Sequence, residues 1–317
     1  MKILEKIDLK IRSLILRYKP KKNFKLAVIV KACYFFFNSY KILFFIGIKK
    51  KHQKKILESS NINELKKNGS LQIELKDLFL DKILNQYINL LNNNQFNSNK
   101  SFLKTYRIDI REKDNQLYLS ILFENNLLDL VKSYLGDYCT LQNVMFMHSE
   151  NNSFEANRSQ QLHIDGDVAD QIKIFIHLSD VDNNSGPLCG FSKNDSKIIF
   201  KNAMNKKYLN YISAKLSDEM IDQKIFDDRL VKFTGSKKTA TLLDTSRCFH
   251  YGSRPGAKPR YILMYQFLKS YSYRVRMFPN KNINLDENAF RFDQIDEIKR
   301  FTKFTDYFPV NQNNKIY

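Results

Sequence analysis

The sequence predicts a mainly β fold, a sandwich or jelly roll with flanking helices. Short segments rich in β-branched and aromatic residues recur at Thr140–Phe146, Gln171–Leu178 and Tyr261–Phe267. Their short length and irregular spacing favour this arrangement over a parallel sheet. The chain has 317 residues, of which 43% are apolar, so it is long enough for one large domain with a substantial core.

The N-terminal segment, residues 1–55, is strongly basic. It holds sixteen Lys and Arg residues against Glu5 and Asp8, so it carries +14 of the chain's formal charge of +19. The other 262 residues balance to +5, which is unremarkable for a globular domain. The basic residues are interleaved with apolar ones and not with a platform on which bases could stack, so nucleic acid is not an expected partner.

Residues 26–48 form the most apolar stretch of this segment and end against a run of lysines. Lys31, Tyr34, Asn38 and Lys41 follow helical spacing, which predicts a helix with one narrow polar stripe. Three placements remain open: contact with an anionic membrane surface, packing on the main domain, or a membrane span. The stripe and the flanking lysines favour surface contact.

Residues 56–99 are expected to form a helical lead-in, since their apolar positions lie near helical spacing. The main domain is expected at residues 100–275. Its first strand is predicted at Gln116–Phe123, where polar and apolar residues alternate.

Two further segments complete the expected organisation. The polar, helix-compatible segment 201–229 is expected to be an insertion between strands of the main domain. Residues 276–317 form a C-terminal extension, with a helix predicted at Asp286–Phe304.

The four cysteines, Cys33, Cys139, Cys189 and Cys248, contain no Cys-x-x-Cys pair, and no secretory cleavage pattern occurs near the start of the sequence. This favours a reducing, cytoplasmic location, or the inner face of a membrane if the basic segment binds there. Cys248 is expected to be a small buried apolar residue.

The motif His163-Ile164-Asp165 carries the first chemical signal. In a strand, residues i and i+2 point to the same face, so an imidazole and a carboxylate converge without any long-range folding. Such a motif is common by chance, and a solvated strand end is the alternative.

A second signal lies in the segment from Asp244 to Arg260. His250 follows the apolar strand Ala240–Leu243, and Arg260 opens another apolar strand beyond a loop rich in Gly and Pro. A second imidazole would complete a two-His, one-carboxylate triad, which leaves positions on iron(II) for a chelating cosubstrate and dioxygen. Arg260 would supply a planar fork for a carboxylate of that cosubstrate.

Together these pieces resemble the pattern of the phytanoyl-CoA dioxygenase family of iron(II)- and 2-oxoglutarate-dependent oxygenases. The resemblance also takes in Ile174–Leu188, which is similar to the family's strand, acidic turn and Gly-Pro, and it covers roughly residues 100–275. It implies a double-stranded β-helix core, also described as a jelly roll or cupin-like fold.

The resemblance also implies roles for individual residues. His163, Asp165 and His250 would hold iron(II), and Arg260 would bind the distal carboxylate of 2-oxoglutarate. Ser253 would contact the same cosubstrate, although the family's small hydroxyl residue is displaced here.

Gln142 and Asn143 lie on a strand that borders the cosubstrate in this family, so one of them would contact 2-oxoglutarate; cross-strand hydrogen bonding is the alternative. The family's usual Pro-Gly-Ser-His turn after Gly186-Pro187 is replaced here by Cys189–Lys193.

The function implied by the resemblance is hydroxylation of an unactivated C–H bond, with release of succinate and CO2. The expected substrate is a small molecule or a lipid- or sugar-linked compound. The carboxylate of Asp165 favours hydroxylation over halogenation, because related halogenases carry a small residue there. The alternative is a catalytically degenerate protein of the same fold that binds a membrane surface or an anion.

Other polar residues near these motifs have a structural interpretation beside a functional one. His148 and His177 are expected to be hydrogen-bonded structural histidines more than substrate or metal contacts. Arg158, Arg247 and Arg254 are candidates for an anionic substrate, although a surface role is the commoner outcome for an arginine.

Overall fold

A computed structural model describes residues 60–76, 79–136, 139–150, 158–165, 170–208 and 215–270, and in the C-terminal part residues 272, 275, 283, 285–286, 289–303 and 305. The basic segment 1–55, and with it the helix expected at 26–48, lies outside these residues. Within them, no helix combines the length and hydrophobicity needed to cross a membrane.

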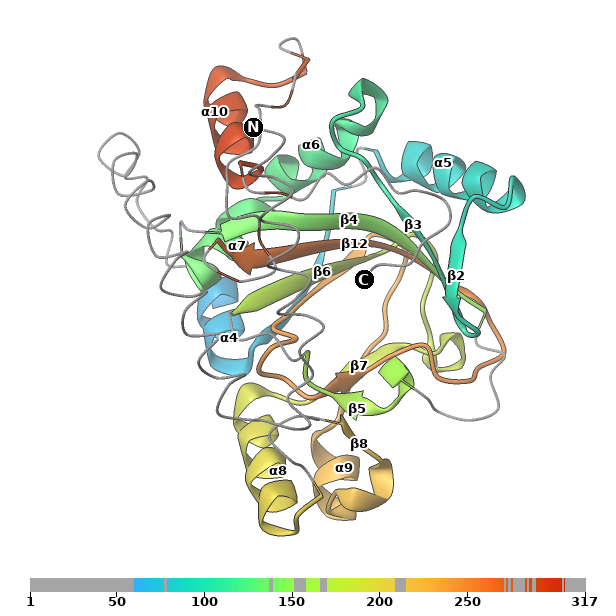
Figure 1. The fold of residues 1–317 in the computed structure, drawn as a ribbon, viewed down its shortest axis with the longest axis vertical. Helices are drawn as coiled ribbons and strands as arrows, with labels where there is room; N and C mark the ends of the chain where they lie inside the picture. Colours follow the sequence, from blue (N-terminus) through green and yellow to red (C-terminus); the bar gives the residue numbers. More distant parts are fainter. Residues whose placement is uncertain are drawn as a thin grey trace, which may run out of the picture.

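Two antiparallel β-sheets face each other and form the core (Figure 1). The larger sheet contains, in spatial order, β1 (Ser70–Glu74), β10 (Thr239–Leu243), β6 (Gln171–His177), β12 (Arg260–Lys269), β4 (Cys139–Ser149), β3 (Leu103–Arg107) and β2 (Asn97–Lys100). The smaller sheet contains β8 (Lys215–Leu216), β5 (Leu162–His163), β11 (His250–Tyr251), β7 (Leu188–Gly190) and β9 (Val231–Phe233). The predicted mainly β fold with a jelly-roll core is confirmed, with sheets that do not close into a barrel.

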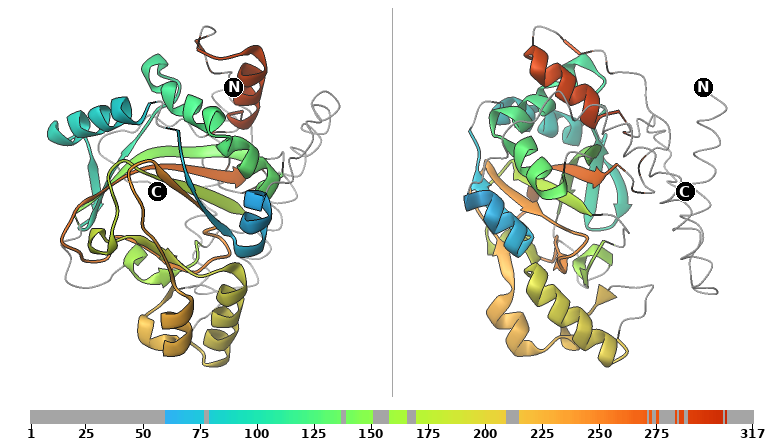
Figure 2. Two further views of the ribbon diagram at one scale, coloured as in Figure 1. Left: turned by 180° about the vertical axis from the view of Figure 1, so that it is seen from behind. Right: turned by 90° about the vertical axis from the view of Figure 1, so that its left-hand side faces the viewer.

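Helices cover the outer sides of both sheets (Figures 1 and 2). On the side of the larger sheet these are α4 (Ser60–Asn68), α5 (Leu80–Asn92), α6 (Leu117–Glu124), α7 (Leu127–Leu135) and α10 (Phe292–Phe301). Beside the smaller sheet lie α8 (Lys193–Asn205) and α9 (Gln223–Arg229). A binding site on the sheets is therefore expected on the sides that face each other.

The larger sheet has two chemically different faces because side chains alternate along each strand. In β6, Ile172, Ile174 and Ile176 are fully buried in the core against the helices. Burying each such side chain contributes about 1.5–3 kcal/mol. The alternate residues, from Gln171 to His177, point toward the smaller sheet, and they form the inner wall.

Methionines and aromatic residues line part of that inner wall. Phe175 lies opposite Met264 in the strand register, and Met264 lies opposite Met145. Met147 and Ile262 form the next row and pack in the same apolar cluster. The interior between the sheets therefore combines an apolar surface with the polar ends of the strands.

Two expectations from the sequence do not hold. Residues Gln116–Phe123 were expected to form a strand, but they form α6, in which Tyr118, Leu119, Ile121 and Leu122 are all buried. The segment is apolar on most sides, so its alternation also fits a fully buried helix. Residues 56–99 are not entirely helical, because Ser70–Glu74 pairs with β10 as an edge strand of the larger sheet.

Three strands and the C-terminal helix expected from the sequence are present. The three strands near residues 140, 171 and 261 are β4, β6 and β12, and the C-terminal helix is the shorter α10. The expected insertion at 201–229 contains the end of α8, β8 and α9, and β8 pairs with β5. It therefore contributes to the sheet that carries His163.

Candidate metal centre

The smaller sheet brings the two candidate histidines together. His163 at the end of β5 is the register partner of His250 at the start of β11, and their ring centroids are 4.3 Å apart. The sequence suggested that the strand Ala240–Leu243 continues toward His250, but it does not. β10 ends at Leu243, and His250 begins β11, which belongs to the other sheet. The chain crosses between the sheets at this point.

Backbone carbonyl groups fix which nitrogen of each ring is available. Nδ1 of His163 lies 2.9 Å from the carbonyl oxygen of Gln161, and Nδ1 of His250 lies 2.9 Å from that of Cys248. A carbonyl oxygen only accepts hydrogen bonds, so each Nδ1 must carry the proton. Each Nε2 therefore presents a lone pair, as a metal-binding imidazole requires.

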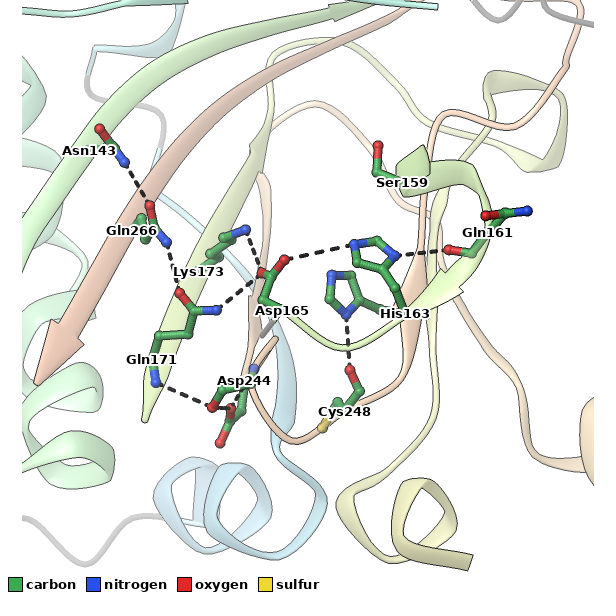
Figure 3. A network of polar contacts seen from close by, with 12 residues as sticks. Asn143, Ser159, Gln161, His163, Asp165, Gln171, Lys173, Asp244, Cys248 and Gln266 are labelled. Carbon is green, nitrogen blue, oxygen red and sulfur yellow. Dashed lines mark hydrogen bonds and ion pairs between the residues drawn. The ribbon is translucent and has the colours of Figure 1, made fainter. Parts of the chain in front are cut away.

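Asp165 completes the group of ligands from a position just beyond β5. Its backbone N–H donates to the carbonyl of Thr245 at 2.8 Å, which ties it to the segment that leads to His250. Its Oδ1 lies 3.8 Å from Nε2 of His163 (Figure 3). One ligand atom from each of His163, Asp165 and His250 lies within 4.8 Å of the others.

The protonation states also suit a metal ion. Burial lowers the pKa of His250 to about 3 and also lowers the pKa of His163. Burial acts in the opposite direction on Asp165, but the nearby Lys173 and the two histidines outweigh it and hold the pKa of this carboxyl well below its usual range. At neutral pH the group is two neutral imidazoles and one carboxylate, the donor set typical of a non-haem iron(II) site with open positions.

Arg260 is a buried cation near this group. Its side chain is 6% exposed, and its Nη2 donates to Oγ of Ser253 at 2.8 Å. Among the described residues it forms no ion pair with a carboxylate, and its Nε has no hydrogen-bond partner. Burial lowers the pKa of Arg260 to about 10, which leaves it charged at neutral pH.

A buried charge without a counterion is unfavourable unless a ligand supplies one. The guanidinium reaches the smaller sheet at Gly252, two residues beyond His250, where an added Cβ would lie 3.4 Å from Nη2. Ser253 has a left-handed backbone with φ of +58° and faces this guanidinium through its hydroxyl. Arg260 and Ser253 thus offer a small anion-binding pair, and their donors fit a carboxylate.

Gln142 and Asn143 lie at an irregularity in the larger sheet. Asn143 is paired with Gln266 and Leu141 with Phe267, so Gln142 is the extra residue of a β-bulge. Gln142 is buried, and its proposed contact with 2-oxoglutarate stays a prediction. For Asn143 the cross-strand alternative holds, because its amide donates to Gln266 at 2.7 Å.

His148 has a hydrogen-bond partner, as expected, whereas Nδ1 of His177 has none among the described residues. His148 faces the helical layer, where it bonds to the hydroxyl of Tyr87 at 2.8 Å and stacks on Tyr261. His177 is buried on the inner wall, and its pKa falls to about 4 because of burial and the neighbouring Arg260.

The three arginines differ in what the structure shows. Arg254 forms a double ion pair with Asp218, and Arg247 pairs with Asp170. Arg158 begins a short 3-10 helix just before β5. Cys248 is fully buried, as expected.

Sequence reasoning missed two polar residues that contact Asp165 and a third that holds one of them. Lys173 donates to Oδ2 of Asp165 at 2.7 Å, Gln171 donates to the same oxygen at 3.1 Å, and Gln266 donates to Gln171 at 2.8 Å (Figure 3). The alternation in Gln171–His177 was a usable signal, because it places Gln171 and Lys173 on the face opposite three buried isoleucines. Their contact with Asp165 depends on tertiary packing.

No family model and no curated protein sequence matches this chain. Among solved structures, the chain is similar to the epimerase SnoN in complex with Fe3+, alpha ketoglutarate and nogalamycin RO, with a TM-score of 0.50 and 12% identity over 66% of this chain and 82% of SnoN. The alpha ketoglutarate dependent carbocyclase SnoK is less similar, with a TM-score of 0.47 and 10% identity over 68% of this chain and 85% of SnoK. HygX from Streptomyces hygroscopicus, with nickel and 2-oxoglutarate bound, has a TM-score of 0.46 and 10% identity over 68% of this chain and 88% of HygX. The resemblance to the phytanoyl-CoA dioxygenase family stays a prediction, and the likeness to SnoN shows that this chain has the jelly-roll fold of that enzyme.

Proposed function

We propose that this chain is an iron(II)- and 2-oxoglutarate-dependent oxygenase that hydroxylates a C–H bond. The observation that carries the proposal is one combination: a triad of His163, Asp165 and His250 beside the buried Arg260, which has no carboxylate partner among the described residues. In an ion-pair network with a purely structural role, protein side chains of opposite charge neutralise each other. This site leaves both a metal position and a carboxylate position to ligands.

Each residue has a distinct role in this proposal. His163, Asp165 and His250 would hold iron(II) through Nε2, Oδ1 and Nε2. Arg260 would bind the distal carboxylate of 2-oxoglutarate, helped by the hydroxyl of Ser253. Bound together, iron(II) and 2-oxoglutarate supply an oxidant from dioxygen that can remove hydrogen from an unactivated C–H bond, with release of succinate and CO2.

The chain's own residues would bind and orient the substrate and limit side reactions. The inner wall of Met145, Met147, Met264 and Phe175 gives a polarisable apolar surface between the sheets. Such a surface suits the hydrocarbon part of a small molecule or of a lipid- or sugar-linked substrate. It would also reduce access of water to the reacting carbon.

The intact donor set favours an active enzyme over the degenerate alternative. A protein that had lost the chemistry would have no requirement for three ligand atoms within 4.8 Å of each other, two of them on histidines whose Nδ1 atoms are both bound to carbonyl groups. SnoN is an epimerase, which gives one other reaction type to test against hydroxylation.

The experiment is turnover with iron(II), 2-oxoglutarate and dioxygen over a panel of lipid-linked, sugar-linked and small polar substrates. We expect succinate formation that depends on all three components and a product heavier by one oxygen atom. A product with the same mass as the substrate would indicate epimerisation and not hydroxylation. Succinate formation no faster than that of the folded Asp165→Ala variant across the panel would contradict the proposal.

We also propose that residues 1–55 deliver the enzyme to an anionic membrane surface. The support is the excess of sixteen basic residues over two acidic ones beside an apolar stretch. Co-sedimentation with vesicles containing anionic lipid should be lost when this segment is removed and should weaken at high salt. Equal sedimentation of the full and truncated chains would contradict this proposal.

A further inference from the structure

The carboxylate of Asp165 has two oxygens with different surroundings. Oδ1 faces His163 at 3.8 Å, whereas Oδ2 accepts hydrogen bonds from Lys173 at 2.7 Å and Gln171 at 3.1 Å (Figure 3). The side chains of Lys173 and Asp165 are only 19% and 21% exposed, so water screens this ion pair less than it would at the surface. The two oxygens are therefore assigned to different partners before any ion binds.

A row of amides holds the Gln171 side of this arrangement in place. Gln171 accepts from Nε2 of Gln266 at 2.8 Å, and Gln266 accepts from Nδ2 of Asn143 at 2.7 Å. A carboxylate can only accept, so Gln171 must present its NH2 group to Asp165, and this choice fixes the orientation of each following amide. The row crosses β6, β12 and β4, so one side chain from each of three strands supports the position of Oδ2.

We propose that Lys173 is a positioning residue that restricts Asp165 to one oxygen at the metal. The inference rests on the proposed function, and it concerns a residue that belongs to none of the metal or cosubstrate contacts described above. The ammonium group and Gln171 together occupy Oδ2, and Oδ1 is the only carboxylate oxygen left facing the imidazoles. A metal ion held by a single oxygen of Asp165 would keep more of its positions for 2-oxoglutarate and dioxygen.

Removal of the ammonium group should have a characteristic effect. In Lys173→Met, Oδ2 would lose its cation while it remains in a mostly buried site beside a divalent ion. The Coulomb attraction of that ion for the second oxygen would no longer be opposed. The carboxylate would turn and bind through both oxygens, which strengthens its hold on the metal and occupies a position that 2-oxoglutarate needs.

The test uses cobalt(II) in place of iron(II), because its d–d absorption reports coordination number without turnover. The full-length protein is titrated with cobalt(II), and the cobalt form is then titrated with 2-oxoglutarate. For Lys173→Met we expect cobalt affinity no weaker than native, a less intense d–d spectrum, and affinity for 2-oxoglutarate lower by about tenfold or more. Lys173→Arg, which keeps a cationic donor, should restore affinity for 2-oxoglutarate.

Lys132→Met is the matched control. Lys132 lies on α7 and pairs with Glu297 at 3.1 Å, and its side chain is 18% exposed, close to the 19% of Lys173. Its loss should change neither the spectrum nor either affinity. A merely structural role for Lys173 predicts parallel loss of cobalt and 2-oxoglutarate binding with an unchanged spectrum.

That parallel loss, or native behaviour of Lys173→Met, would overturn the inference while leaving the proposed function intact. Failure of the native protein to bind cobalt(II) would instead overturn the metal centre itself, and the inference with it.

Discussion

His163 and His250 lie directly opposite each other on adjacent antiparallel strands, with ring centroids 4.3 Å apart. Each ring is oriented by a hydrogen bond from Nδ1 to the carbonyl two residues earlier in the chain, just before its own strand. The same local hydrogen bond therefore orients both rings, and both Nε2 lone pairs are available to a metal ion without rearrangement. Burial lowers the pKa of both rings, so protons compete weakly with a metal ion at neutral pH.

Replacing either histidine should abolish tight metal binding. His163→Gln and His250→Gln each remove one of three protein ligands, and calorimetric titration with cobalt(II) should show affinity lower by more than about 100-fold. His148→Gln is the control, because His148 is also buried but faces the helical layer. Native cobalt affinity in either single variant would contradict the assignment.

Arg260→Met should change stability and cosubstrate binding in opposite directions. Loss of a buried guanidinium without a carboxylate partner should raise the free energy of unfolding of the ligand-free protein by about 1–3 kcal/mol. Loss of its charge-assisted hydrogen bonds should weaken 2-oxoglutarate binding to the metal-loaded protein by about 1.5–3 kcal/mol. Urea denaturation and a titration with 2-oxoglutarate measure the two effects.

The control for this pair of effects is Arg254→Met. Arg254 forms a double ion pair with Asp218 and covers the ring of Tyr251, so its loss should lower stability and spare 2-oxoglutarate binding. If Arg260→Met is less stable than the native protein and binds 2-oxoglutarate normally, Arg260 has a structural role only.

His177 should make stability depend on pH below neutrality. Burial, with help from Arg260, lowers its pKa from 6.5 to about 4 in the folded protein. Between these values the unfolded chain binds a proton that the folded chain does not, so stability falls as pH falls through this range. In His177→Gln this loss is absent, and the native-minus-variant difference in unfolding free energy should shrink by about 3 kcal/mol from pH 7 to pH 4. Parallel urea-denaturation profiles across this range would refute the assignment.

Gly256→Ala should damage the loop that carries Ser253. An added Cβ would lie 2.2 Å from the backbone oxygen of Asn184, where the loop docks through the bond from Lys258 N–H to Asn184 at 3.0 Å. We expect a loss of about 1–3 kcal/mol in unfolding free energy, as for other overpacked sites. Affinity for 2-oxoglutarate should fall more than cobalt affinity, because Arg260 and Ser253 depend on this loop.

Gly252→Ala is the comparison for stability, since its added Cβ would approach no atom closer than 3.4 Å. Thermal denaturation of the two variants should differ clearly. Equal melting temperatures would show that the loop yields at Gly256.

The parts of the site that could be predicted from sequence are those with local signals. His163 and Asp165 are two residues apart, and Arg260 opens an apolar strand ten residues after His250. The jelly-roll core was predictable for the same reason, because β4, β6 and β12 are long and rich in β-branched and aromatic residues.

The remaining features depend on contacts between distant segments. Ser70–Glu74 is a strand because β10 offers it an edge, and the alternating residues of α6 form a helix because the helical layer buries them on several sides. The pairing of Lys173 with Asp165 arises where β6 passes β5 across the interior of the fold. The residue pattern of either strand alone does not predict this ion pair.

The most direct test of the account is an anaerobic titration of the native protein with iron(II) and 2-oxoglutarate, followed by visible absorption. We predict a weak charge-transfer band that requires both ligands, is absent in Asp165→Ala, and in Arg260→Met appears only at much higher 2-oxoglutarate concentration. Absence of the band in folded native protein at saturating iron(II) and 2-oxoglutarate would contradict the proposed metal centre.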